Sequence, residues 1–378
     1  MVVLLDSLIA LGGAETLAVD LAIGLDPARY RRTLFITRDQ SEIAEREPQR
    51  SVLRELAASG VDVRWLHREG ARSLRAWLPL LRFLKREKVD VVHAHKFGSN
   101  AWAVLWGRLA RVAVVVAHEH MWSYTDSSAL RRFVDRRVIG PFSDAFIAVS
   151  EEGLRQMIDV VGVNPGDVEY VPNGVPLPPE PDRVAARKRL GLNGETPVAG
   201  TVALLRPEKQ LEVLVEATAR LRERHPGART VIIGEGPERE LLERRIAELD
   251  LGETVVLAGY RDDVQQVLPA FDVAVCCSKF EGGPLSVMEY MAAALPTVAS
   301  SVGGLPELLG EGECGVLVPE GDAWALAAAI GELADDPGRR LQMGERARER
   351  MRDIYSLPGW VGRIEGVYER CLNAKGVS

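Results

Sequence analysis

The chain has 378 residues, of which 47% are hydrophobic, and a formal net charge of −7 at pH 7. This length allows two domains of roughly 150 residues, each with its own core, and it excludes a single small binding module. Divided after residue 178, the chain has 23 Lys+Arg against 22 Asp+Glu and then 24 against 32, so the two parts carry +1 and −8. The acidic second part argues against a nucleic-acid partner, which favours a basic face.

No apolar run reaches the length of about 18 residues that a membrane-spanning helix needs. Asp6 and Glu15 stand where a signal peptide would have basic residues and then an apolar core. We therefore expect a soluble, cytoplasmic protein, with peripheral contact at the inner membrane face left open. Four cysteines without a Cys-x-x-Cys spacing are expected to be reduced packing residues; they are Cys276, Cys277, Cys314 and Cys371.

Short apolar runs rich in β-branched residues alternate with amphipathic helical stretches in the first part of the chain. The runs span residues 2–5, 33–37, 61–66, 89–95, 113–120 and 145–150. This alternation predicts a parallel sheet covered by helices on both faces. The segment Pro172 to Pro181, with five prolines and a turn-forming Asn173-Gly174, predicts a linker between domains.

The alternation restarts beyond this linker, with strand-like runs at residues 197–204, 229–234, 254–260, 272–278, 296–301 and 314–319. The predicted fold class is α/β, with two doubly wound Rossmann-like domains that face a cleft. We expect an N-terminal domain at 1–175 and a C-terminal domain at 176–355. A last helix at 356–374 is expected to return to the first domain, because its aromatic residues Trp360 and Tyr368 have no obvious place in the second.

A Glu-Gly-Gly-Pro turn follows the run at 272–278, and a second glutamate comes eight positions after the first. Pro284 is expected to start a helix, whose free N–H groups would suit a diphosphate. Gly282 lets backbone approach a ligand where a side chain would collide. Glu281 and Glu289 can each accept hydroxyl donors, as sugars and ribose present. If only the spacing of the two glutamates is considered, an ordinary β-α turn without a ligand is the alternative interpretation.

Further motifs occur in a fixed order along the chain. They are Gly12-Gly13-Ala14-Glu15, VVHAH at 91–95, AVS at 148–150, VPNGV at 171–175, RPEK at 206–209, IGEGPE at 233–238 and FEGGPLSVMEYMAAALPTVASSVGGLPEL at 280–308. This combination resembles the retaining glycosyltransferase family 4, which has the GT-B fold. The resemblance implies that a sugar moves from a nucleoside-diphosphate-sugar donor to a hydroxyl acceptor that is a small molecule, a lipid-linked group or a glycan.

The resemblance also implies roles for residues of the second domain. Glu281 would contact sugar hydroxyls, and Glu289 would contact the ribose. Tyr260 and Arg261 resemble the base-binding loop of the family. The sugar and diphosphate would be bound by the segment Gly282, Gly283, Pro284, Leu285 and Ser286. In the first domain, Gly12 and Gly13 resemble the glycine loop that closes over the phosphates of the donor.

The cations that would neutralise the diphosphate depart from the family pattern. Lys209 is present, but the position five residues earlier, commonly an arginine in the family, is Leu204. Arg206 is a candidate substitute, because a planar guanidinium suits phosphate oxygens. A solvated loop arginine is the alternative reading of Arg206.

Four of the six histidines form two pairs of spacing two, and each pair is expected on one side of a strand end. His118 matches a family histidine near the reacting sugar, whereas His95 and His120 are acceptor-side candidates. A zinc site with Glu119 is conceivable, but packing or sugar contact is the favoured interpretation.

No carboxylate nucleophile is apparent. The family's reaction is a front-face one, in which the protein stabilises the leaving group, and we expect no metal or other cofactor.

Basic residues concentrate in two segments of the first domain. Residues 64–88 contain eight Lys or Arg and two acids, with an apolar stripe of Leu74, Leu78, Leu81 and Leu84. The second cluster is Arg131, Arg132, Arg136 and Arg137. Contact with an anionic membrane is one hypothesis, and a solvated helix face over the core is the favoured one.

Other functions compatible with such a fold remain open. One is a different GT-B enzyme, such as a nucleotide-sugar epimerase or a phosphorylase. Another is a nucleotide-sugar-binding protein without catalytic activity. This alternative stays open because Leu204 stands where the family commonly has an arginine.

Overall fold

The computed structural model describes residues 1–8, 12–38, 47–68, 74–120, 128–178, 182–192 and 196–377. The chain divides into two compact units. Unit 1 comprises Met1–Gly174 and Leu357–Ser378, and unit 2 comprises Val175–Ser356. The boundary expected after residue 175 lies one residue from this division.

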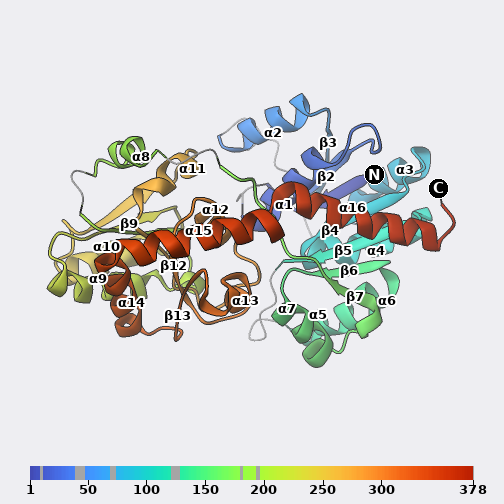
Figure 1. Ribbon diagram of the computed structural model, residues 1–378. Helices are drawn as coiled ribbons and strands as arrows, with labels where there is room; N and C mark the ends of the chain where they lie inside the picture. The colour runs from blue at the N-terminus through green and yellow to red at the C-terminus, as the bar shows by residue number, and fades with distance from the viewer. Residues whose placement is uncertain are drawn as a thin grey trace. The chain divides into compact units, whose positions relative to one another are not determined.

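A parallel sheet of seven strands forms the centre of unit 1 (Figure 1). The strands are β1 (Val2–Leu5), β2 (Thr33–Arg38), β3 (Asp62–Arg68), β4 (Val91–His95), β5 (Val114–Glu119), β6 (Ala145–Ala148) and β7 (Val168–Tyr170). Their spatial order is β3-β2-β1-β4-β5-β6-β7, so the direction in which strands are added changes between β1 and β4. Ligands of such sheets bind at this switch point, beyond the carboxyl ends of the strands.

Helices lie on both faces of the unit 1 sheet. They are α1 (Gly13–Gly24), α2 (Gln49–Ala58), η1 (Leu74–Trp77), α3 (Leu78–Arg86), α4 (Lys96–Ala110), α5 (Ala129–Val134), η2 (Asp135–Ile139), α6 (Gly140–Phe142), α7 (Glu151–Gln156), η3 (Met157–Val161) and η4 (Pro165–Asp167). Successive side chains of β1 point to opposite faces of the sheet and so belong to two different hydrophobic clusters. Val2 and Leu4 join the cluster around Trp77, while Val3 and Leu5 join the cluster around α1 on the other face.

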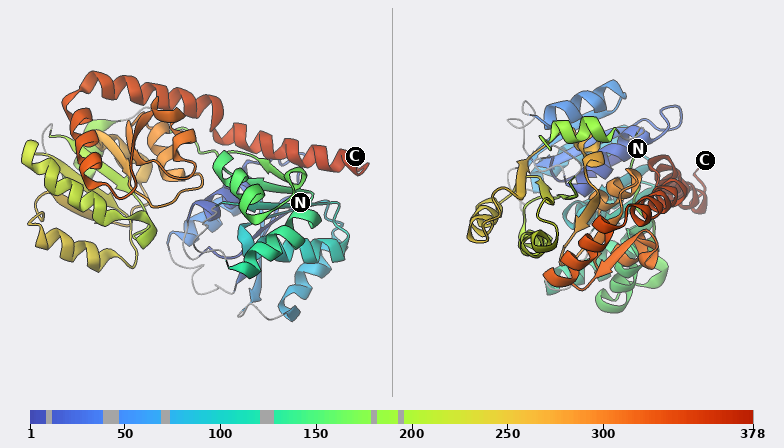
Figure 2. Two further views of the ribbon diagram at one scale, coloured as in Figure 1. Left: turned by 90° about the horizontal axis from the view of Figure 1, so that it is seen from below. Right: turned by 60° about the vertical axis from the view of Figure 1, so that its left-hand side comes forward.

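The last helix of the chain, α16 (Leu357–Ala374), belongs to unit 1, where it contacts α1 and β5. Figure 2 shows it in red, running along unit 1 toward the C-terminus. Trp360 and Tyr368, the two aromatic residues of this helix, are both fully buried. The helix is therefore part of the core of unit 1.

Unit 2 is built around a parallel sheet of six strands. They are β8 (Val198–Val202), β9 (Arg229–Ile233), β10 (Val255–Gly259), β11 (Val273–Cys276), β12 (Thr297–Ser300) and β13 (Gly315–Val318). Their order is β10-β9-β8-β11-β12-β13, so the switch point lies between β8 and β11. The loops after these two strands therefore meet where a ligand is expected.

The unit 2 sheet also has a hydrophobic cluster on each face. Its helices are α8 (Arg183–Arg189), η5 (Pro207–Lys209), α9 (Leu211–Arg224), α10 (Arg239–Glu248), α11 (Val264–Val267), η6 (Leu268–Ala270), α12 (Leu285–Ala292), α13 (Leu305–Leu308), η7 (Gly310–Gly312), α14 (Ala323–Asp335) and α15 (Pro337–Ile354). Side chains of Asp182, Asp322 and Asp336 cap α8, α14 and α15 by accepting backbone N–H groups.

Two details differ from the sequence predictions. Strand β7 was not expected, because three residues are too short to show a periodicity. Half of the predicted leucine stripe faces the core: Leu84 is buried and Leu81 packs against the same cluster, whereas Leu74 and Leu78 are exposed. The reason is that η1 ends at Trp77 and α3 begins at Leu78, so one helical register does not run through the segment.

The four cysteines are free, as expected; three are buried and Cys371 is half-buried. Of the expected linker, residues 172–178 form no helix and contain one isolated bridge, from Val175 to Ser356. Residues 179–181 lie outside the described residues.

Candidate active site

Two charged side chains meet at the switch point of unit 2. Lys209 ends the short helix η5 after β8, and Glu281 lies in the loop after β11. The Lys209 Nζ atom lies 2.5 Å from Glu281 Oε1, and the two side chains are 24% and 7% exposed. The structure thus brings together two of the residues that the motifs singled out.

The position of Glu281 is fixed by neighbours on several sides. Ser278 Oγ donates to Glu281 Oε1 at 2.6 Å, and the backbone N–H of Gly304 donates to the Glu281 carbonyl at 3.0 Å. Gly303 has φ +54°, and a Cβ there would lie 1.9 Å from the same carbonyl oxygen. Glycine is therefore required at 303 for the loop after β12 to approach Glu281.

The Lys209 ammonium remains charged in this buried place. Burial is the largest single effect and lowers its pKa, but Glu281, Cys276 and Glu208 together outweigh it, so the net pKa lies above the ordinary value. The neighbouring Cys276 thiol behaves in the opposite sense, since burial and the Glu281 charge raise its pKa to about 11. Cys276 therefore remains a protonated packing residue at neutral pH.

Helix α12 begins directly after the two glycines. Pro284 is its N-cap rather than its first residue, so the sequence prediction is wrong by one position; the backbone of Pro284 is extended, with ψ 115°. Proline offers no side-chain acceptor, so the N–H groups of Leu285, Ser286 and Val287 depend on other partners. Glu289 lies one turn further along the helix and is half-buried.

The glycine-rich loop after β9 approaches the segment that leads from β8 to Lys209. A Cβ on Gly234 would lie 1.9 Å from the Ala203 carbonyl oxygen, and one on Gly236 would lie 2.4 Å from that of Leu205. Leu205 N also donates to the Glu235 carbonyl at 3.0 Å. These close contacts hold the segment that carries Lys209 against the sheet.

Three other residues are expected to bind the donor, namely Tyr260, Arg261 and Arg206. Tyr260, just after β10, is 56% exposed. Arg261 forms two 2.7 Å hydrogen bonds with Asp263. Arg206 is exposed, and its only ion pair with a described residue is a 3.8 Å contact to Glu208. The structure therefore does not bring Arg206 into the Lys209–Glu281 pair.

Unit 1 has a corresponding pair at its own switch point. Gly12 is the N-cap of α1 and Gly13 its first residue, while residues 9–11 of this loop lie outside the described residues. Glu15 is 6% exposed and forms an ion pair with Lys96, the residue that follows β4. Sequence reasoning did not single out Lys96, because only the strand order brings it next to Glu15.

The four histidines at the ends of β4 and β5 form one stack. The rings of His93 and His95 lie 4.6 Å apart, and those of His118 and His120 lie 4.3 Å apart, so each pair shares one side of its strand as predicted. Between the strands, His93 Nε2 lies 3.1 Å from His118 Nδ1, and His95 Nδ1 lies 2.8 Å from His120 Nε2. His93 Nδ1 also contacts the Tyr368 hydroxyl of α16 at 2.6 Å.

All four imidazoles are held neutral. Burial lowers the pKa of His118 to about 3, and it lowers the pKa values of His93, His95 and His120 well below the usual range. The Asn100 side chain exchanges two 3.2 Å hydrogen bonds with the backbone of His118. His118 is therefore held in position through both its ring and its backbone.

His93, His95 and His118 bring one ring nitrogen each within 4.8 Å of one another, as metal ligands could. A bound metal requires lone pairs that converge on one point, and an imidazole lone pair lies in the ring plane. The His93 and His95 planes are stacked and within 5° of parallel, so their lone pairs do not converge. This ring geometry disfavours a shared metal ion.

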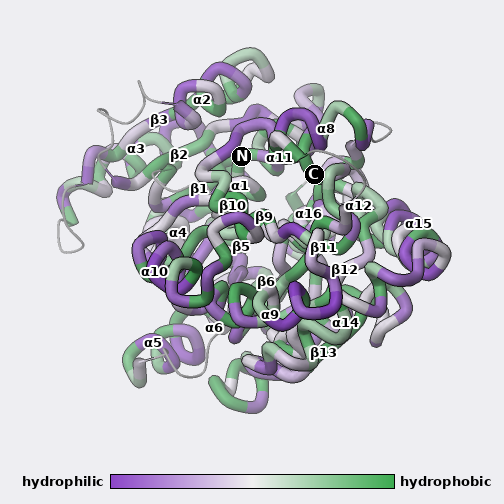
Figure 3. Tube along the Cα trace, turned by 90° about the vertical axis from the view of Figure 1, so that its left-hand side faces the viewer, coloured by the Kyte–Doolittle hydropathy of each residue, from purple (hydrophilic) through white to green (hydrophobic). Residues whose placement is uncertain are grey.

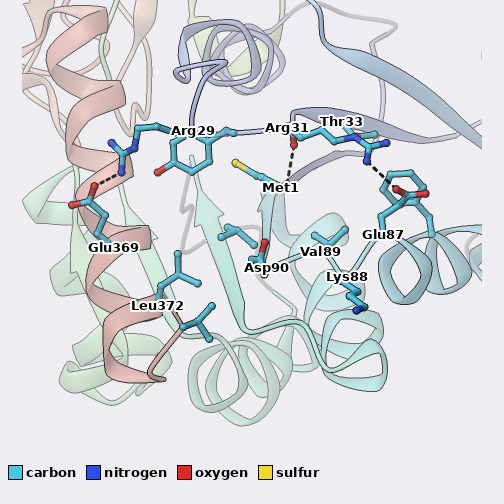
Figure 4. Close-up of a pocket in the computed structure, with 14 residues that line it drawn as sticks. Met1, Arg29, Arg31, Thr33, Glu87, Lys88, Val89, Asp90, Glu369 and Leu372 are labelled. Atoms are coloured by element: carbon cyan, nitrogen blue, oxygen red, sulfur yellow. Dashed lines mark hydrogen bonds and ion pairs between the residues drawn. The ribbon is translucent and has the colours of Figure 1, made fainter.

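A pocket of about 460 Å³ lies elsewhere in unit 1, among the amino ends of strands β1, β2 and β4 (Figure 4). Ion pairs between Arg31 and Glu87, at 3.0 Å, and between Arg29 and Glu369 lie along its lining. Because ligands of doubly wound sheets bind at the carboxyl ends, this pocket is not the candidate active site.

The arginines of the second basic cluster of unit 1 differ in whether they form ion pairs. Arg131 forms ion pairs with Glu119, at 3.0 Å, and with Asp135, at 3.7 Å. Arg136 and Arg137 are exposed and have no ion pair with any described residue. Among the described helices, none is long and apolar enough to cross a membrane.

Family models match both parts of the chain. The model of Glycosyltransferase Family 4 matches residues 11–177, and that of Glycosyl transferases group 1 matches residues 182–350.

Two relatives illustrate the sequence similarity. The chain is 31% identical to the D-inositol 3-phosphate glycosyltransferase of Kineococcus radiotolerans, over 74% of this chain and 70% of that protein. It is 32% identical to the GDP-mannose-dependent alpha-(1-6)-phosphatidylinositol monomannoside mannosyltransferase of Mycolicibacterium smegmatis, over 71% and 73% of the two chains.

Solved structures share the fold. HepE of Anabaena, in complex with UDP-glucose, has a TM-score of 0.85 and 21% identity, with 98% of this chain and 99% of that chain covered. The sucrose-phosphate synthase of Thermosynechococcus elongatus has a TM-score of 0.82 and 22% identity, with coverages of 99% and 100%. The predicted fold class, α/β with two doubly wound Rossmann-like domains, is confirmed.

Proposed function

The chain belongs to glycosyltransferase family 4 and is a glycosyltransferase, and from this premise we propose that it transfers its sugar with retention of configuration. The donor is a nucleoside-diphosphate sugar held by unit 2, and the acceptor is a hydroxyl group held by unit 1. The observation that supports this donor site is the contact between Lys209 and Glu281 at the switch point between β8 and β11.

The donor contacts follow from the chemistry of this site. The N-terminus of α12 offers backbone N–H groups and the positive end of a helix dipole to the diphosphate. Glu281 accepts hydrogen bonds from sugar hydroxyls, and Glu289 accepts them from the ribose. Tyr260 and Arg261, after β10, are the candidates for contact with the base. On the unit 1 side, Gly12 and Gly13 are proposed to approach the phosphates.

The cation that stabilises the leaving diphosphate is Lys209. Its ammonium is charged and partly buried, so its interaction with developing negative charge is stronger than it would be in water. Arg206 is a second candidate that would have to turn inward from its exposed position. Because backbone N–H groups and Lys209 provide the positive charge, we propose a reaction that requires no metal.

The acceptor side is assigned to the ends of β4 and β5. His118 is proposed to lie near the reacting sugar, with His95 and His120 toward the acceptor. A different GT-B reaction, such as epimerisation of a nucleotide sugar, is the alternative within this fold. A binder without catalysis would retain donor affinity but would release no nucleoside diphosphate from it.

We further propose a cytoplasmic location with peripheral contact to an anionic membrane, through the surface formed by α5 and α6. Leu130, Phe133 and Phe142 on this surface are 71%, 59% and 54% exposed. The exposed Arg136 and Arg137 lie between them in the sequence, and Figure 3 shows hydrophobic and hydrophilic residues alternating along α5. Apolar side chains with adjacent cations are what an anionic bilayer surface favours.

Sedimentation with vesicles tests the membrane contact. Salt-sensitive binding to vesicles rich in anionic lipid is expected, and the double substitution Arg136→Glu and Arg137→Glu should weaken it. Arg224→Glu, on α9 of unit 2, is the matched control and should bind as the unmodified chain does. Absence of salt-sensitive binding by the unmodified chain would refute this contact.

Calorimetric titration of the full chain tests donor binding. UDP, GDP and ADP are compared with their sugar conjugates, and one base is expected to be preferred. Glu281→Ala should remove the additional affinity that the sugar provides while bare nucleoside diphosphate still binds. Glu243→Ala, at an exposed carboxylate of α10, is the control. If none of these nucleotides binds, the proposed donor class is wrong.

A further inference from the structure

A continuous hydrogen-bonded chain links the last helix of the protein to His118. The Tyr368 hydroxyl contacts His93 Nδ1 at 2.6 Å, and His93 Nε2 contacts His118 Nδ1 at 3.1 Å. All three side chains are fully buried, and all belong to unit 1. Tyr368 lies 275 residues after His93, so this chain exists only because α16 returns to unit 1.

The direction of these hydrogen bonds follows from where the protons can go. The buried phenol of Tyr368 has one hydrogen-bonding partner among the described residues, which is His93. If His93 donated to it instead, the phenol proton would be buried without an acceptor, and that arrangement is unfavourable. Burial also raises the pKa of Tyr368 well above its usual value, so the proton stays on the phenol. Tyr368 therefore donates to His93 Nδ1.

The remaining protons are then determined. A neutral imidazole carries a single ring proton, so His93 has its proton on Nε2 and donates it to His118 Nδ1. His118, neutral as well, must carry its own proton on Nε2. This Nε2 atom is buried and has no hydrogen-bond partner among the described residues. The His118 Nε2–H group is therefore a hydrogen-bond donor without an acceptor among the described residues.

We propose that Tyr368 and His93 are positioning residues that fix His118 as its Nε2–H tautomer, so that His118 donates a hydrogen bond to a hydroxyl oxygen of the transferred sugar. This proposal rests on the proposed function, because it takes the reacting sugar to lie at the end of β5. It excludes His118 as a base for the acceptor, since the Nδ1 lone pair already accepts from His93 and Nε2 is protonated. His118 would orient the sugar and would not exchange a proton.

The neighbouring pair provides an internal comparison. His95 Nδ1 lies 2.8 Å from His120 Nε2, but the outer nitrogens of this pair, His95 Nε2 and His120 Nδ1, have no hydrogen-bond partner among the described residues. Among the residues that the structure describes, no hydroxyl contacts either outer nitrogen, so the direction of donation is not set. The hydrogen bonds therefore fix which ring nitrogen is protonated in His93 and His118, but they do not fix it in His95 and His120.

Nitrogen-15 NMR of the imidazoles in the full chain, labelled at histidine, tests the tautomer directly. The His118 signals are assigned by their loss in His118→Asn. At pH 7.5 the unmodified protein is expected to show His118 protonated on Nε2, and Tyr368→Phe should shift His118 toward a mixture of tautomers. Tyr30→Phe is the matched control, because Tyr30 packs against the ring of Tyr368 at 6.2 Å without reaching a histidine. It should leave the His118 signals unchanged.

Kinetics of donor turnover supply a second readout. Tyr368→Phe should lower kcat by about tenfold or more, because the sugar is oriented less well, while KM for the donor changes little. His93→Gln keeps an N–H that can reach His118 and should retain more activity than His93→Phe. An Nδ1–H tautomer of His118 in the unmodified protein, or unchanged His118 signals in Tyr368→Phe, would overturn the proposal. Failure of any nucleotide sugar to bind would instead refute the proposed function and leave the tautomer result standing.

Discussion

Lys209 and Glu281 form an ion pair in which each neutralises the charge of the other. Ser278 adds a hydrogen bond to the same Glu281 oxygen that Lys209 contacts, Oε1. Under the proposed function, the diphosphate would compete for the ammonium and a sugar hydroxyl for the carboxylate, so donor binding would replace one set of charge contacts with another. Removing either partner alone would leave a buried charge without compensation, which is costly in proteins.

The two candidate cations should differ in their effect on turnover. Lys209→Met is expected to lower kcat for donor turnover by about 100-fold or more, the usual effect of removing a group that stabilises a leaving group. Arg206→Ala is expected to change kcat by less than about threefold, because the exposed guanidinium is not held in the site. Steady-state kinetics of both variants check this. An equal loss in Arg206→Ala would mean that Arg206 turns inward during the reaction.

Asp135 gives a pH-dependent prediction at the residue scale. Burial and the nearby Glu119 charge raise its pKa to about 7 from an ordinary value of 3.8. Between those pH values the folded state binds more protons than the unfolded state, so this residue makes stability fall as pH rises from about 4 to 7. Each pKa unit corresponds to about 1.4 kcal/mol.

Asp135→Asn should therefore stabilise the protein at pH 8, by about 1–3 kcal/mol, and should stabilise it clearly less at pH 5. Urea unfolding at the two pH values measures the difference. Asp159→Asn, on the nearby exposed face of η3, serves as the control and should show no such pH dependence. The assignment fails if Asp135→Asn is destabilising at pH 8.

At the scale of elements, the loops that follow β11 and β12 act together. Gly303 permits the loop after β12 to contact the carbonyl of Glu281, and its positive φ is one that other residues adopt at a cost. Gly303→Ala should destabilise unit 2 by about 1–3 kcal/mol and weaken donor binding at the same time. Gly252→Ala, where a Cβ would have open space, is the control. Wild-type donor affinity in Gly303→Ala would show that this contact does not position Glu281.

The histidine stack between β4 and β5 predicts sensitivity to acid. Burial keeps the pKa of His118 at about 3 and those of its three neighbours well below the usual range. The unfolded chain takes up protons as pH falls through about 6.5, whereas the folded stack does not, so stability is present above that pH and is lost below it.

The free energy of unfolding should consequently fall between pH 7.5 and 5. His95→Asn should reduce the size of this fall, and His225→Gln, in unit 2, should retain it. Denaturant titrations at several pH values provide the measurement. A fall of the same size in His95→Asn would contradict the assignment of acid sensitivity to the stack.

The sequence predicted elements better than contacts. Buried parallel strands are visible as runs of β-branched residues, so the strands around Val115 and Val275 were recognisable from the sequence. The edge strand β7 was missed because Val168–Tyr170 owes its extended form to pairing with β6, which only the folded sheet provides. The start of α12 was misplaced by one residue because proline suits either side of a helix boundary.

Within the candidate site, the glutamates, Lys209 and the histidines could be predicted because they belong to ordered motifs. Their partners could not. Ser278 and Gly303 gain their importance from the side chain and backbone of Glu281, and Tyr368 gains its importance from a contact across 275 residues. Such contacts depend on strand order and on the return of α16, neither of which a local pattern contains.

For the whole molecule, the division into two units accounts for the chain's two different kinds of polar site. Unit 2 holds a charged pair, a helix N-terminus and close glycine loops, which suit a diphosphate and a sugar. Unit 1 holds neutral, hydrogen-bonding imidazoles that suit hydroxyl groups. We propose that this division corresponds to one unit for the donor and one for the acceptor.

The central claim is that the full chain transfers a sugar with retention of configuration. Proton NMR of a reaction started with an α-linked nucleotide sugar, chosen by the binding panel and mixed with a panel of hydroxyl acceptors or with water alone, follows the anomeric signal of the first product. The account predicts release of nucleoside diphosphate together with an α-configured product, both abolished in Glu281→Ala. A β-configured first product, or an epimerised donor with no transfer, would contradict it.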